Sequence, residues 1–357
     1  MTTRPFDAAK AEAFQARVLD VLNGGALALM MSIGHQTGLF DAMAGRPPAT
    51  SQELAAATGL DERYVREWLA AMATGRVLEL EPQTARYRLP DEHAGVLTRA
   101  AGAHNFALTA QYLPLLASVE QAIVECFRNG GGVPYPAFQR FHAVMAEESA
   151  AVHDVALLDV TLPLVPGALE WLRSGCDVLD VGCGRGHALN LMARAFPASR
   201  FVGYDLSAEA IAAARDEAAQ LGAANVRFET RDVTKLGHAN AFDLVTAFDA
   251  IHDQGFPEQV LRGIARALRP GRAFLMVDIA GATSVAENLD HPLGPFLYTV
   301  SCMHCMTVSL AQGGVGLGTM WGEEKARQLL AEAGFDKVDV TRIESDPVNA
   351  YYVATRD

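Results

Sequence analysis

The chain is poor in positive charge for its length. Its 357 residues include 29 Lys and Arg against 42 Asp and Glu, which gives a formal net charge of −13. Nucleic acids and anionic membrane surfaces both attract proteins through clustered Lys and Arg. We therefore expect neither a nucleic acid nor a membrane surface as the partner of this chain.

Cysteine is scarce, and long apolar runs are missing. No segment approaches the roughly 18 apolar residues of a membrane span, and the N-terminus lacks the layout of a signal peptide. An odd number of scattered cysteines suits free thiols in a reducing cytosol better than a disulfide framework, so we expect a cytoplasmic protein. The five cysteines are Cys126, Cys176, Cys183, Cys302 and Cys305.

The sequence pattern changes twice along the chain, and the length allows two or three domains. We predict a winged-helix-like domain over residues 1–100 and a helical linker and pocket wall over residues 101–170. An α/β domain follows over residues 171–357, with a lid-like insertion at 281–320.

The first domain opens with apolar helical spacing. A helix is expected over residues 7–22, an interruption at Asn23-Gly24-Gly25, and a second helix to about Ile33. The segment that begins at Gly38 is expected to be a turn.

A helix-turn-helix pattern comes next. Thr50 and Glu53 form a capping box for a helix over 51–58, and Asp61 caps a second helix with one apolar face. Two short strands, 77–81 and 86–89, then form a hairpin. This order of elements is a winged-helix layout.

From Cys176 onward, expected strands and helices alternate. Repeated βα units predict a Rossmann-like, doubly wound sheet of seven mostly parallel strands, with ligands at the carboxyl ends of the strands. The expected strands cover 177–181, 200–204, 226–230, 242–248, 273–279, 337–343 and 350–355, and the helices 188–195, 208–221, 257–268 and 323–333.

A glycine-rich turn follows the first of these strands and opens a helix. Gly182, Gly184 and Gly186 let the chain bend and let a ligand approach the backbone. The third glycine comes one residue too early for the nicotinamide-type fingerprint, and Asp180 before the turn would repel a pyrophosphate. Asp205 and Asp232 follow the next two strands, so three strands end in a carboxylate on one edge. Helix capping is the alternative role for each acid.

With these acids and glycines in this order, residues 176–355 resemble the class I S-adenosylmethionine-dependent methyltransferases. The resemblance implies S-adenosylmethionine as the cofactor and S-adenosylhomocysteine as the product. It implies that Asp205 holds the ribose hydroxyls and that Asp232 accepts from the adenine amino group. The cofactor-binding residues expected on this basis are Asp180, Gly182, Cys183, Gly184, Gly186, Asp205, Leu206, Asp232, Val233, Phe248 and Asp249.

The segment after the fourth strand carries His252, Asp253 and Gln254. It resembles the His-Asp segment of small-molecule O-methyltransferases of the plant phenolic type, where the His deprotonates the acceptor hydroxyl. The resemblance implies His252 and Asp253 as the catalytic residues, with His252 as general base. A pocket wall or a helix cap is the alternative role for His252. Those enzymes carry Trp where this chain carries Gln254, which leaves the acceptor open, and Asp249 could contact either the acceptor or the cofactor's amine.

The insertion offers candidate walls for an acceptor pocket. A helix is expected over 294–312, and on it Tyr298, Cys302 and Cys305 share one face. Four residues are expected to close the pocket from the N-terminal side: Tyr135, Phe138, His142 and His153. The alternative is that the two cysteines are small buried apolar residues. His304 points away from both thiols on such a helix, so no metal site is expected.

The first domain has two candidate roles. Many small-molecule methyltransferases carry a similar module that dimerises, and the whole chain resembles a bacterial group of methyltransferases with such a winged-helix region. This implies a homodimer. The alternative is a DNA-binding regulator that uses S-adenosylmethionine as effector. Residues 50–90 hold five Arg and no Lys against six acids, which disfavours DNA.

These observations together predict an S-adenosylmethionine-dependent methyltransferase that acts on a small-molecule hydroxyl, phenol or thiol. A nicotinamide enzyme is a further alternative, which the glycine spacing disfavours.

Overall fold

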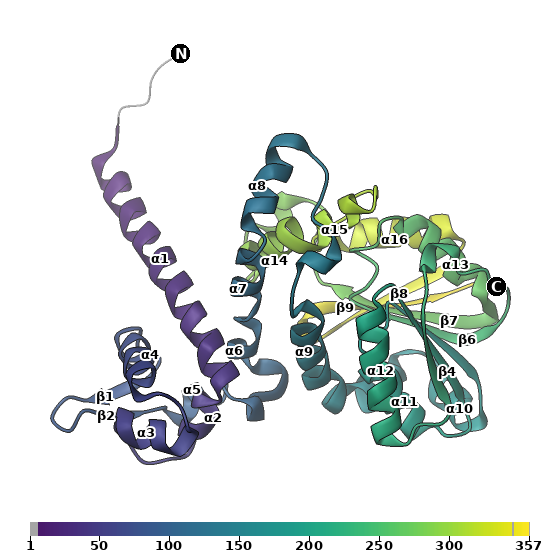
Figure 1. Cartoon of the computed structure of the whole chain (residues 1–357). Coiled ribbons are helices and arrows are strands. Elements are labelled where there is room, and N and C mark those ends of the chain that lie inside the picture. Colours follow the sequence, from purple (N-terminus) through teal and green to yellow (C-terminus); the bar gives the residue numbers. More distant parts are fainter. Residues whose placement is uncertain (1–5, 345, 357) are drawn as a thin grey trace. The chain divides into compact units, whose positions relative to one another are not determined.

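The structure is a computed structural model, and it describes residues 6–344 and 346–356. The chain divides into two compact units, Met1–Pro114 and Leu115–Asp357 (Figure 1). Each unit has its own hydrophobic core and is described separately below.

The first unit begins with a helix of 30 residues, α1 (Ala8–Thr37). The predicted interruption at Asn23-Gly24-Gly25 is wrong, because α1 runs straight through it. A glycine inside a helix costs about 1 kcal/mol but removes no hydrogen bond, so it does not by itself stop the helix. The helix ends instead at Gly38, which adopts the left-handed conformation and caps the last turn. The segment expected to be a turn there forms the short helix α2 (Leu39–Met43).

The winged-helix layout is confirmed. The capping box of Thr50 and Glu53 opens α3 (Ser51–Thr58), and the Asp61 carboxylate caps α4 (Glu62–Thr74). The hairpin is formed by β1 (Glu79–Glu81) and β2 (Arg86–Arg88). The indole Nε1 of Trp68 donates a hydrogen bond to the carbonyl of Met30, which fixes α4 against α1 in this unit's core.

Short helices continue from the hairpin to the sheet, with a break at 130–134. The boundary between the two units falls within α7. These elements are α5 (Asp91–Ala94), η1 (Arg99–His104), α6 (Phe106–Thr109), α7 (Tyr112–Ala117), α8 (Glu120–Asn129), η2 (Tyr135–Ala137), α9 (Phe141–Ala156), the π-helical η3 (Leu157–Thr161), η4 (Leu162–Leu164) and α10 (Ala168–Ser174).

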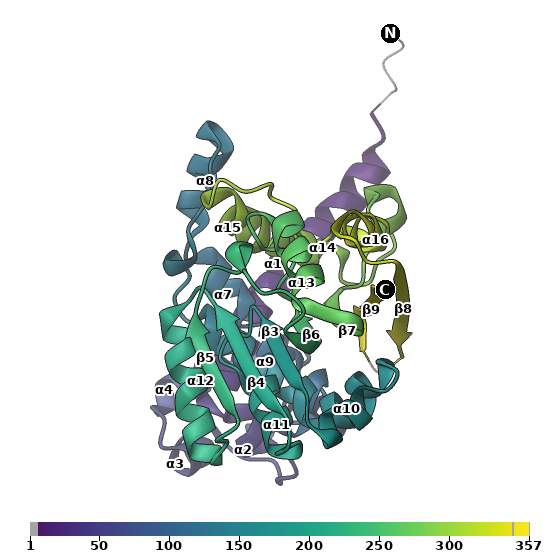
Figure 2. The same cartoon turned by 90° about the vertical axis from the view of Figure 1, so that its right-hand side faces the viewer.

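The second unit is built on the predicted seven-stranded sheet, in the order β5-β4-β3-β6-β7-β9-β8 (Figure 2). All neighbours pair in parallel except β9, which is antiparallel to both β7 and β8. The strands are β3 (Asp177–Val181), β4 (Arg200–Asp205), β5 (Val226–Thr230), β6 (Phe242–Phe248), β7 (Leu268–Ile279), β8 (Lys337–Ile343) and β9 (Asp346–Thr355).

Helices cover both faces of this sheet, as expected for a doubly wound fold. One face packs against α10, α11 (His187–Ala195) and α12 (Ala208–Leu221), and the other against η5 (Val233–Lys235), α13 (Pro257–Ala267) and α16 (Gly322–Ala333). The central strands β3 and β6 are buried on both faces, and most of their residues are apolar. The insertion contributes η6 (Val285–Asn288), α14 (Gly294–Val300), the π-helical turn η7 (Ser301–Cys305) and α15 (Met306–Ala311).

One described helix, α1, is long and apolar enough to cross a membrane by length and composition alone. The bent pair Phe141–Leu164 and Ala168–Ser174 meets the same two criteria when it is taken together. Core helices and signal sequences also meet them, so the expectation that no segment spans a membrane stays a prediction.

Candidate active site

The glycine-rich turn forms an open cradle at the carboxyl end of β3. Gly182, Gly184 and Gly186 all have positive φ, between 52° and 74°, which disfavours other residues. A Cβ at Gly182 would lie 2.5 Å from Ala250, and one at Gly186 would lie 2.6 Å from Phe228. A Cβ at Gly184 would meet nothing within 4 Å. Gly184 is therefore the point where a ligand can approach the backbone.

Asp205 and Asp180 face this turn from neighbouring strands. The Asp205 carboxylate accepts hydrogen bonds from the backbone N–H groups of Gly184 and Ser207, at 2.9 and 2.8 Å. Asp180 is buried and accepts from Thr246 Oγ1 at 2.7 Å. Burial raises the pKa of Asp180 to about 7, and the negative charge of Asp205 adds to that effect. A cationic ligand beside them would favour both carboxylates in the ionised form.

The third strand-end acid has a structural partner of its own. Asp232 is the N-cap of η5 and accepts from the backbone N–H and hydroxyl of Thr234, at 3.0 and 2.6 Å. Val233 is buried next to it, whereas Leu206, directly after Asp205, is 53% exposed. An exposed leucine and two carboxylates at one edge suit a molecule with an apolar ring and hydroxyl groups.

Two further expected residues lie close to this edge. Cys183 is half-buried within the turn, and its thiol sulfur would be 2.8 Å from a Cβ at Gly203. Phe248 ends β6, and its ring contacts that of His153 at 4.8 Å between centroids. Burial lowers the pKa of His153 to about 4, so its ring is neutral and packs as an aromatic group.

His252 is held by a carboxylate that the sequence analysis did not single out. Its Nδ1 lies 2.8 Å from Asp278 Oδ1, and both side chains are buried. The same oxygen accepts from the Trp321 indole at 3.1 Å and from the Ile279 backbone at 2.8 Å. Asp278 belongs to β7, so its place at the carboxyl end of a strand was the available signal.

The charge state of His252 follows from this pairing. Burial alone would lower the pKa of His252, but the Asp278 carboxylate outweighs it and, together with Cys305, raises that pKa well above its ordinary value. Burial raises the pKa of the neighbouring Asp253 to about 7. Asp253 can therefore gain or lose a proton near neutral pH, whereas His252 loses its proton at higher pH than a free histidine does.

Asp249 directly follows β6, three residues before His252. Its φ of 49° is unusual for a residue other than glycine, and its Oδ1 has no hydrogen-bond partner among the described residues. Burial raises the pKa of Asp249 to about 8, and the negative charge of Asp278 acts in the same direction. Strained backbone and an unsatisfied carboxylate are typical of positions that contact a ligand.

The insertion forms the expected helical span, but a π-helical turn divides it. Cys305 is buried and helps to raise the pKa of His252. Cys302 lies half-buried in the same turn. Tyr298, one segment earlier, accepts a hydrogen bond from Asn288 within the insertion. Ser309 is also engaged, because its hydroxyl donates to the carbonyl of Gln254, outside the insertion.

An aromatic cluster joins the insertion to the start of α9. Tyr135, Phe138 and His142 were expected here, and the structure adds Phe141 and His304. The pKa of Tyr135 is raised by burial and then by the negative charges of Asp253 and Asp205, so this cluster lies near both the acid–base pair and the cofactor edge. No His, Cys, Asp or Glu group within residues 6–344 and 346–356 is arranged to hold a metal ion.

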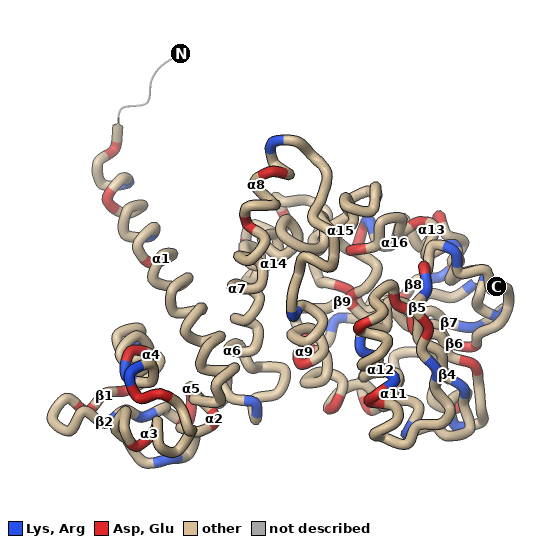
Figure 3. The backbone as a smooth tube through the Cα atoms, in the orientation of Figure 1, with Lys and Arg blue, Asp and Glu red and all other residues tan. Residues whose placement is uncertain are grey.

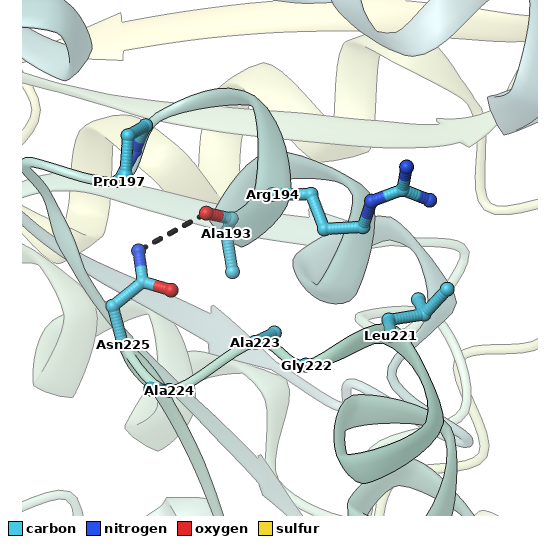
Figure 4. A pocket seen from close by; sticks show the side chains of 8 residues that line it. All are labelled: Ala193, Arg194, Pro197, Leu221, Gly222, Ala223, Ala224 and Asn225. Atoms are coloured by element: carbon cyan, nitrogen blue, oxygen red, sulfur yellow. Dashed lines mark hydrogen bonds between the residues drawn. The ribbon is translucent and has the colours of Figure 1, made fainter.

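A separate surface hollow lies away from these residues (Figure 4). Its lining comes from the end of α11 and the loop between α12 and β5, so it is at the amino ends of β4 and β5. Asn225 there donates to the carbonyls of Ala193, Phe196 and Ser199, which uses its amide for the fold. The hollow is therefore on the edge of the sheet opposite to the candidate active site.

Comparison with protein families agrees with this geometry. Residues 25–99 match the Rv2258c-like winged HTH domain, and residues 172–340 match a methyltransferase domain. The chain is therefore a two-domain protein in which a winged helix-turn-helix domain precedes a methyltransferase domain, and the resemblance drawn from the sequence is confirmed.

Curated relatives match less than half of the chain. A ubiquinone biosynthesis O-methyltransferase of Albidiferax ferrireducens is 31% identical over 113 residues, which is 30% of this chain and 44% of that protein. The 27-O-demethylrifamycin SV methyltransferase of Amycolatopsis mediterranei is 31% identical over 158 residues, 42% of this chain and 56% of that protein. The chain thus spans about half the length of these relatives.

Solved structures match both domains. The mitomycin 7-O-methyltransferase MmcR superposes with a TM-score of 0.71 at 18% identity, covering 98% of this chain and 100% of that one. Human N-acetylserotonin methyltransferase, solved with S-adenosylmethionine, gives 0.65 at 17% identity, with 100% and 99% coverage. At these identities the likeness shows the fold, which confirms the predicted architecture.

Proposed function

We propose that this protein transfers a methyl group from S-adenosylmethionine to the hydroxyl of a small molecule and releases S-adenosylhomocysteine. The observation that carries the proposal is the buried pair of His252 and Asp278 at the sheet edge that also bears the glycine cradle. The methyltransferase domain and the names of the curated relatives support the same reaction. A small thiol remains an alternative acceptor, which the assay below separates.

The cofactor fits the residues present at that edge. S-adenosylmethionine supplies, when bound, an activated methyl group on a positively charged sulfur. We assign the ribose hydroxyls to Asp205, the adenine amino group to Asp232, and the apolar sides of the adenine to Leu206 and Val233. The open side of Gly184 gives the cofactor room against the backbone. Asp180, Gly182, Cys183, Gly186, Phe248 and Asp249 complete the proposed cofactor site.

His252 is the proposed general base. Its Nδ1 is engaged by Asp278, so Nε2 is the atom left to take the proton from the acceptor hydroxyl. Asp278 holds the imidazole in one orientation and stabilises the imidazolium that forms. Asp253 follows His252 in the chain, and its ionised form is favoured by positive charge on that ring. Proton removal of this kind contributes about 10²–10⁴-fold to a rate.

The remaining expected residues wall the acceptor. Tyr135 and Phe138 supply aromatic rings from the segment before α9, and Tyr298, Cys302 and Cys305 come from the insertion. Cys305 helps to raise the pKa of His252, so we place Cys305 closest to the reacting hydroxyl.

Turnover on an acceptor panel tests this function. S-adenosylhomocysteine release is measured with phenols, carboxylic acids, amines and thiols, while calorimetry measures S-adenosylmethionine binding separately. Turnover on a phenol is the expected result. Turnover confined to thiols would reassign the acceptor to sulfur, and cofactor binding without any turnover would favour the DNA-binding regulator.

We also propose that the first unit forms a homodimer through α1. Phe14, Val18 and Leu22 follow each other at one helical face and are 65%, 42% and 65% exposed. Few charged positions interrupt α1 (Figure 3). Such an exposed apolar stripe fits a second copy of the same helix.

Helix α4, the recognition helix of the alternative DNA-binding role, has its arginines in ion pairs. On α4, Arg63 pairs with Glu67, and Arg66 pairs with Glu62 at 2.6 Å. These are the cations that a recognition helix would present to phosphates.

Light scattering tests the dimer. Leu22→Glu is expected to give a monomer, whereas Ala16→Glu, on another face of the same helix, leaves the dimer intact. A monomeric wild type would contradict the proposal, as would recovery of the chain with the membrane fraction. The five free cysteines fit a cytoplasmic location, which we propose alongside.

A further inference from the structure

Five rings meet beside the proposed acceptor site. They come from η2 and the residue after it, from the start of α9, and from the π-helical turn η7. The members are Tyr135, Phe138, Phe141, His142 and His304, and we call this group the aromatic cluster.

His304 is at the centre of the aromatic cluster. Its ring stacks on Phe141 at 3.6 Å between centroids and 9° between planes. The rings of Phe138 and Tyr135 meet it edge-on at 4.7 and 5.1 Å. The side chain is held in one orientation by these contacts, and the residue is 1% exposed.

The polar atoms of this ring are unsatisfied. Neither Nδ1 nor Nε2 of His304 has a hydrogen-bond partner anywhere in the described part of the chain. Buried polar atoms in folded proteins are almost always paired, and each exception calls for an explanation. Phenylalanine would pack in this aromatic setting without that penalty, so packing alone does not account for an imidazole.

The imidazole is neutral. Burial lowers the pKa of His304 well below its ordinary value, and positive charge on His252 and His142 acts in the same direction. A neutral imidazole offers one N–H donor and one lone pair, so it can bind a group that accepts, a group that donates, or a hydroxyl that does both.

The π-helical turn connects this ring to the proposed base. Two consecutive residues of η7 contribute to two different groups. Cys305 raises the pKa of His252, and His304 belongs to the aromatic cluster. Such turns are often found at functional sites. The unsatisfied ring is thus one residue away from the side chain that we place closest to the reacting hydroxyl.

We propose that His304 is a specificity residue that hydrogen-bonds a second polar group on a flat aromatic acceptor. This inference rests on the proposed function, since it adds a requirement to the same acceptor. The acceptor then carries one hydroxyl directed to His252 and a neighbouring hydroxyl or carbonyl directed to His304. Its ring plane packs among the aromatic cluster, whose stacked and edge-on contacts suit a planar molecule.

Paired ligands test this inference without relying on turnover. Calorimetry with S-adenosylhomocysteine present compares catechol with phenol, and 1,8-dihydroxynaphthalene with 1-naphthol. Wild type is expected to bind each two-group ligand more tightly. His304→Phe keeps a ring in the cluster and removes both nitrogens, so the two-group ligands should lose about three- to tenfold in affinity while the one-group ligands change less than twofold.

A second readout follows the His304 ring itself in the wild-type chain. The imidazole nitrogen resonance of His304, assigned by its loss in His304→Phe or His304→Asn, is expected to shift when catechol binds and to stay in place with phenol. A ring that only packs would not distinguish the two ligands. This measurement holds even where one variant folds poorly.

The outcomes separate the two proposals. Equal binding of both ligands in each pair, or no binding of either, overturns the role of His304, whether or not the enzyme methylates some other hydroxyl. A clear preference that His304→Phe abolishes supports the role, even where no methyl transfer is seen, and in that case the proposed function alone fails.

Discussion

The Nδ1 atom of His252 lies 2.8 Å from Oδ1 of Asp278, and both side chains are buried. The pair joins the segment after β6 to the end of β7, two strands that are neighbours in the sheet. The fold therefore fixes the partner of Nδ1, and Nε2 is the nitrogen left for the acceptor.

Replacing Asp278 by Asn should impair catalysis more than binding. The amide keeps the shape of the carboxyl but removes the charge that orients and stabilises the protonated His252. We expect kcat to fall by about 10²–10⁴-fold, while the dissociation constant of S-adenosylmethionine stays within about threefold. Steady-state kinetics and calorimetry measure the two quantities. Trp321→Phe removes only a donor to Asp278 and serves as the milder control. Parallel losses in kcat and cofactor affinity would argue for a general defect.

The rate of methyl transfer should rise with pH above neutrality. Against the effect of burial, Asp278 raises the pKa of His252 well above its ordinary value, so the base form of the imidazole accumulates at higher pH than in a free histidine. Asp278→Asn should move this rise to lower pH, because the raising charge is gone. The pH profile of kcat/KM in both proteins decides this, and a profile that is flat from pH 6 to 9 would speak against His252 as the base.

Gly184→Ala should weaken the cofactor specifically. The methyl group meets no protein atom within 4 Å and would therefore occupy space proposed for the cofactor. Gly222→Ala is the matched control, since Gly222 also has positive φ and open space but ends α12. Both variants should lose about 1–2 kcal/mol of unfolding free energy, whereas only Gly184→Ala should weaken S-adenosylmethionine binding, by about tenfold or more. If the two variants bound S-adenosylmethionine with similar affinity, the glycine-rich turn would not be the cofactor site.

His187 should make stability depend on pH. It lies at the start of α11, with Nδ1 bonded to Glu217 and Nε2 2.9 Å from Asp154. The hydrogen bond to Glu217 raises the pKa of His187, and Asp154 supports it against the effect of burial. Because the folded pKa lies above 6.5, the contribution is complete below that value and is lost as pH rises through the folded pKa.

Urea unfolding at pH 6 and pH 9 measures this contribution. From pH 6 to pH 9, the unfolding free energy of wild type should fall by about 1 kcal/mol more than that of His187→Gln. The difference between the proteins isolates His187 from groups that titrate in both. Equal losses would mean that the ion pairs of His187 contribute nothing measurable.

Local signals were enough to predict most of the fold. The strands from β3 to β6 are short apolar segments bounded by turns, and each lies within a βα unit, so their pattern and order could be read along the chain. The glycines and Asp205 followed from the same reading, because strand ends in such a sheet share one edge.

The parts that the sequence missed depend on distant contacts. The glycines at 24 and 25 resemble a break, yet α1 continues to a stronger stop signal at Gly38. Asp278 was visible as a strand-end acid, but its partner His252 is set by the pairing of β6 with β7. His304 was assigned to an ordinary helix, and the π-helical turn that places it in the aromatic cluster leaves no local signature.

The most direct test of the central claim is a single-turnover comparison of wild type and His252→Ala on one phenol and one small thiol at the same pH. The account predicts that the variant, still binding S-adenosylmethionine, loses about 10²–10⁴-fold on the phenol, which needs a base, and much less on the thiol, which ionises more readily. Equal phenol rates in the two proteins would contradict the assignment of His252 as the base.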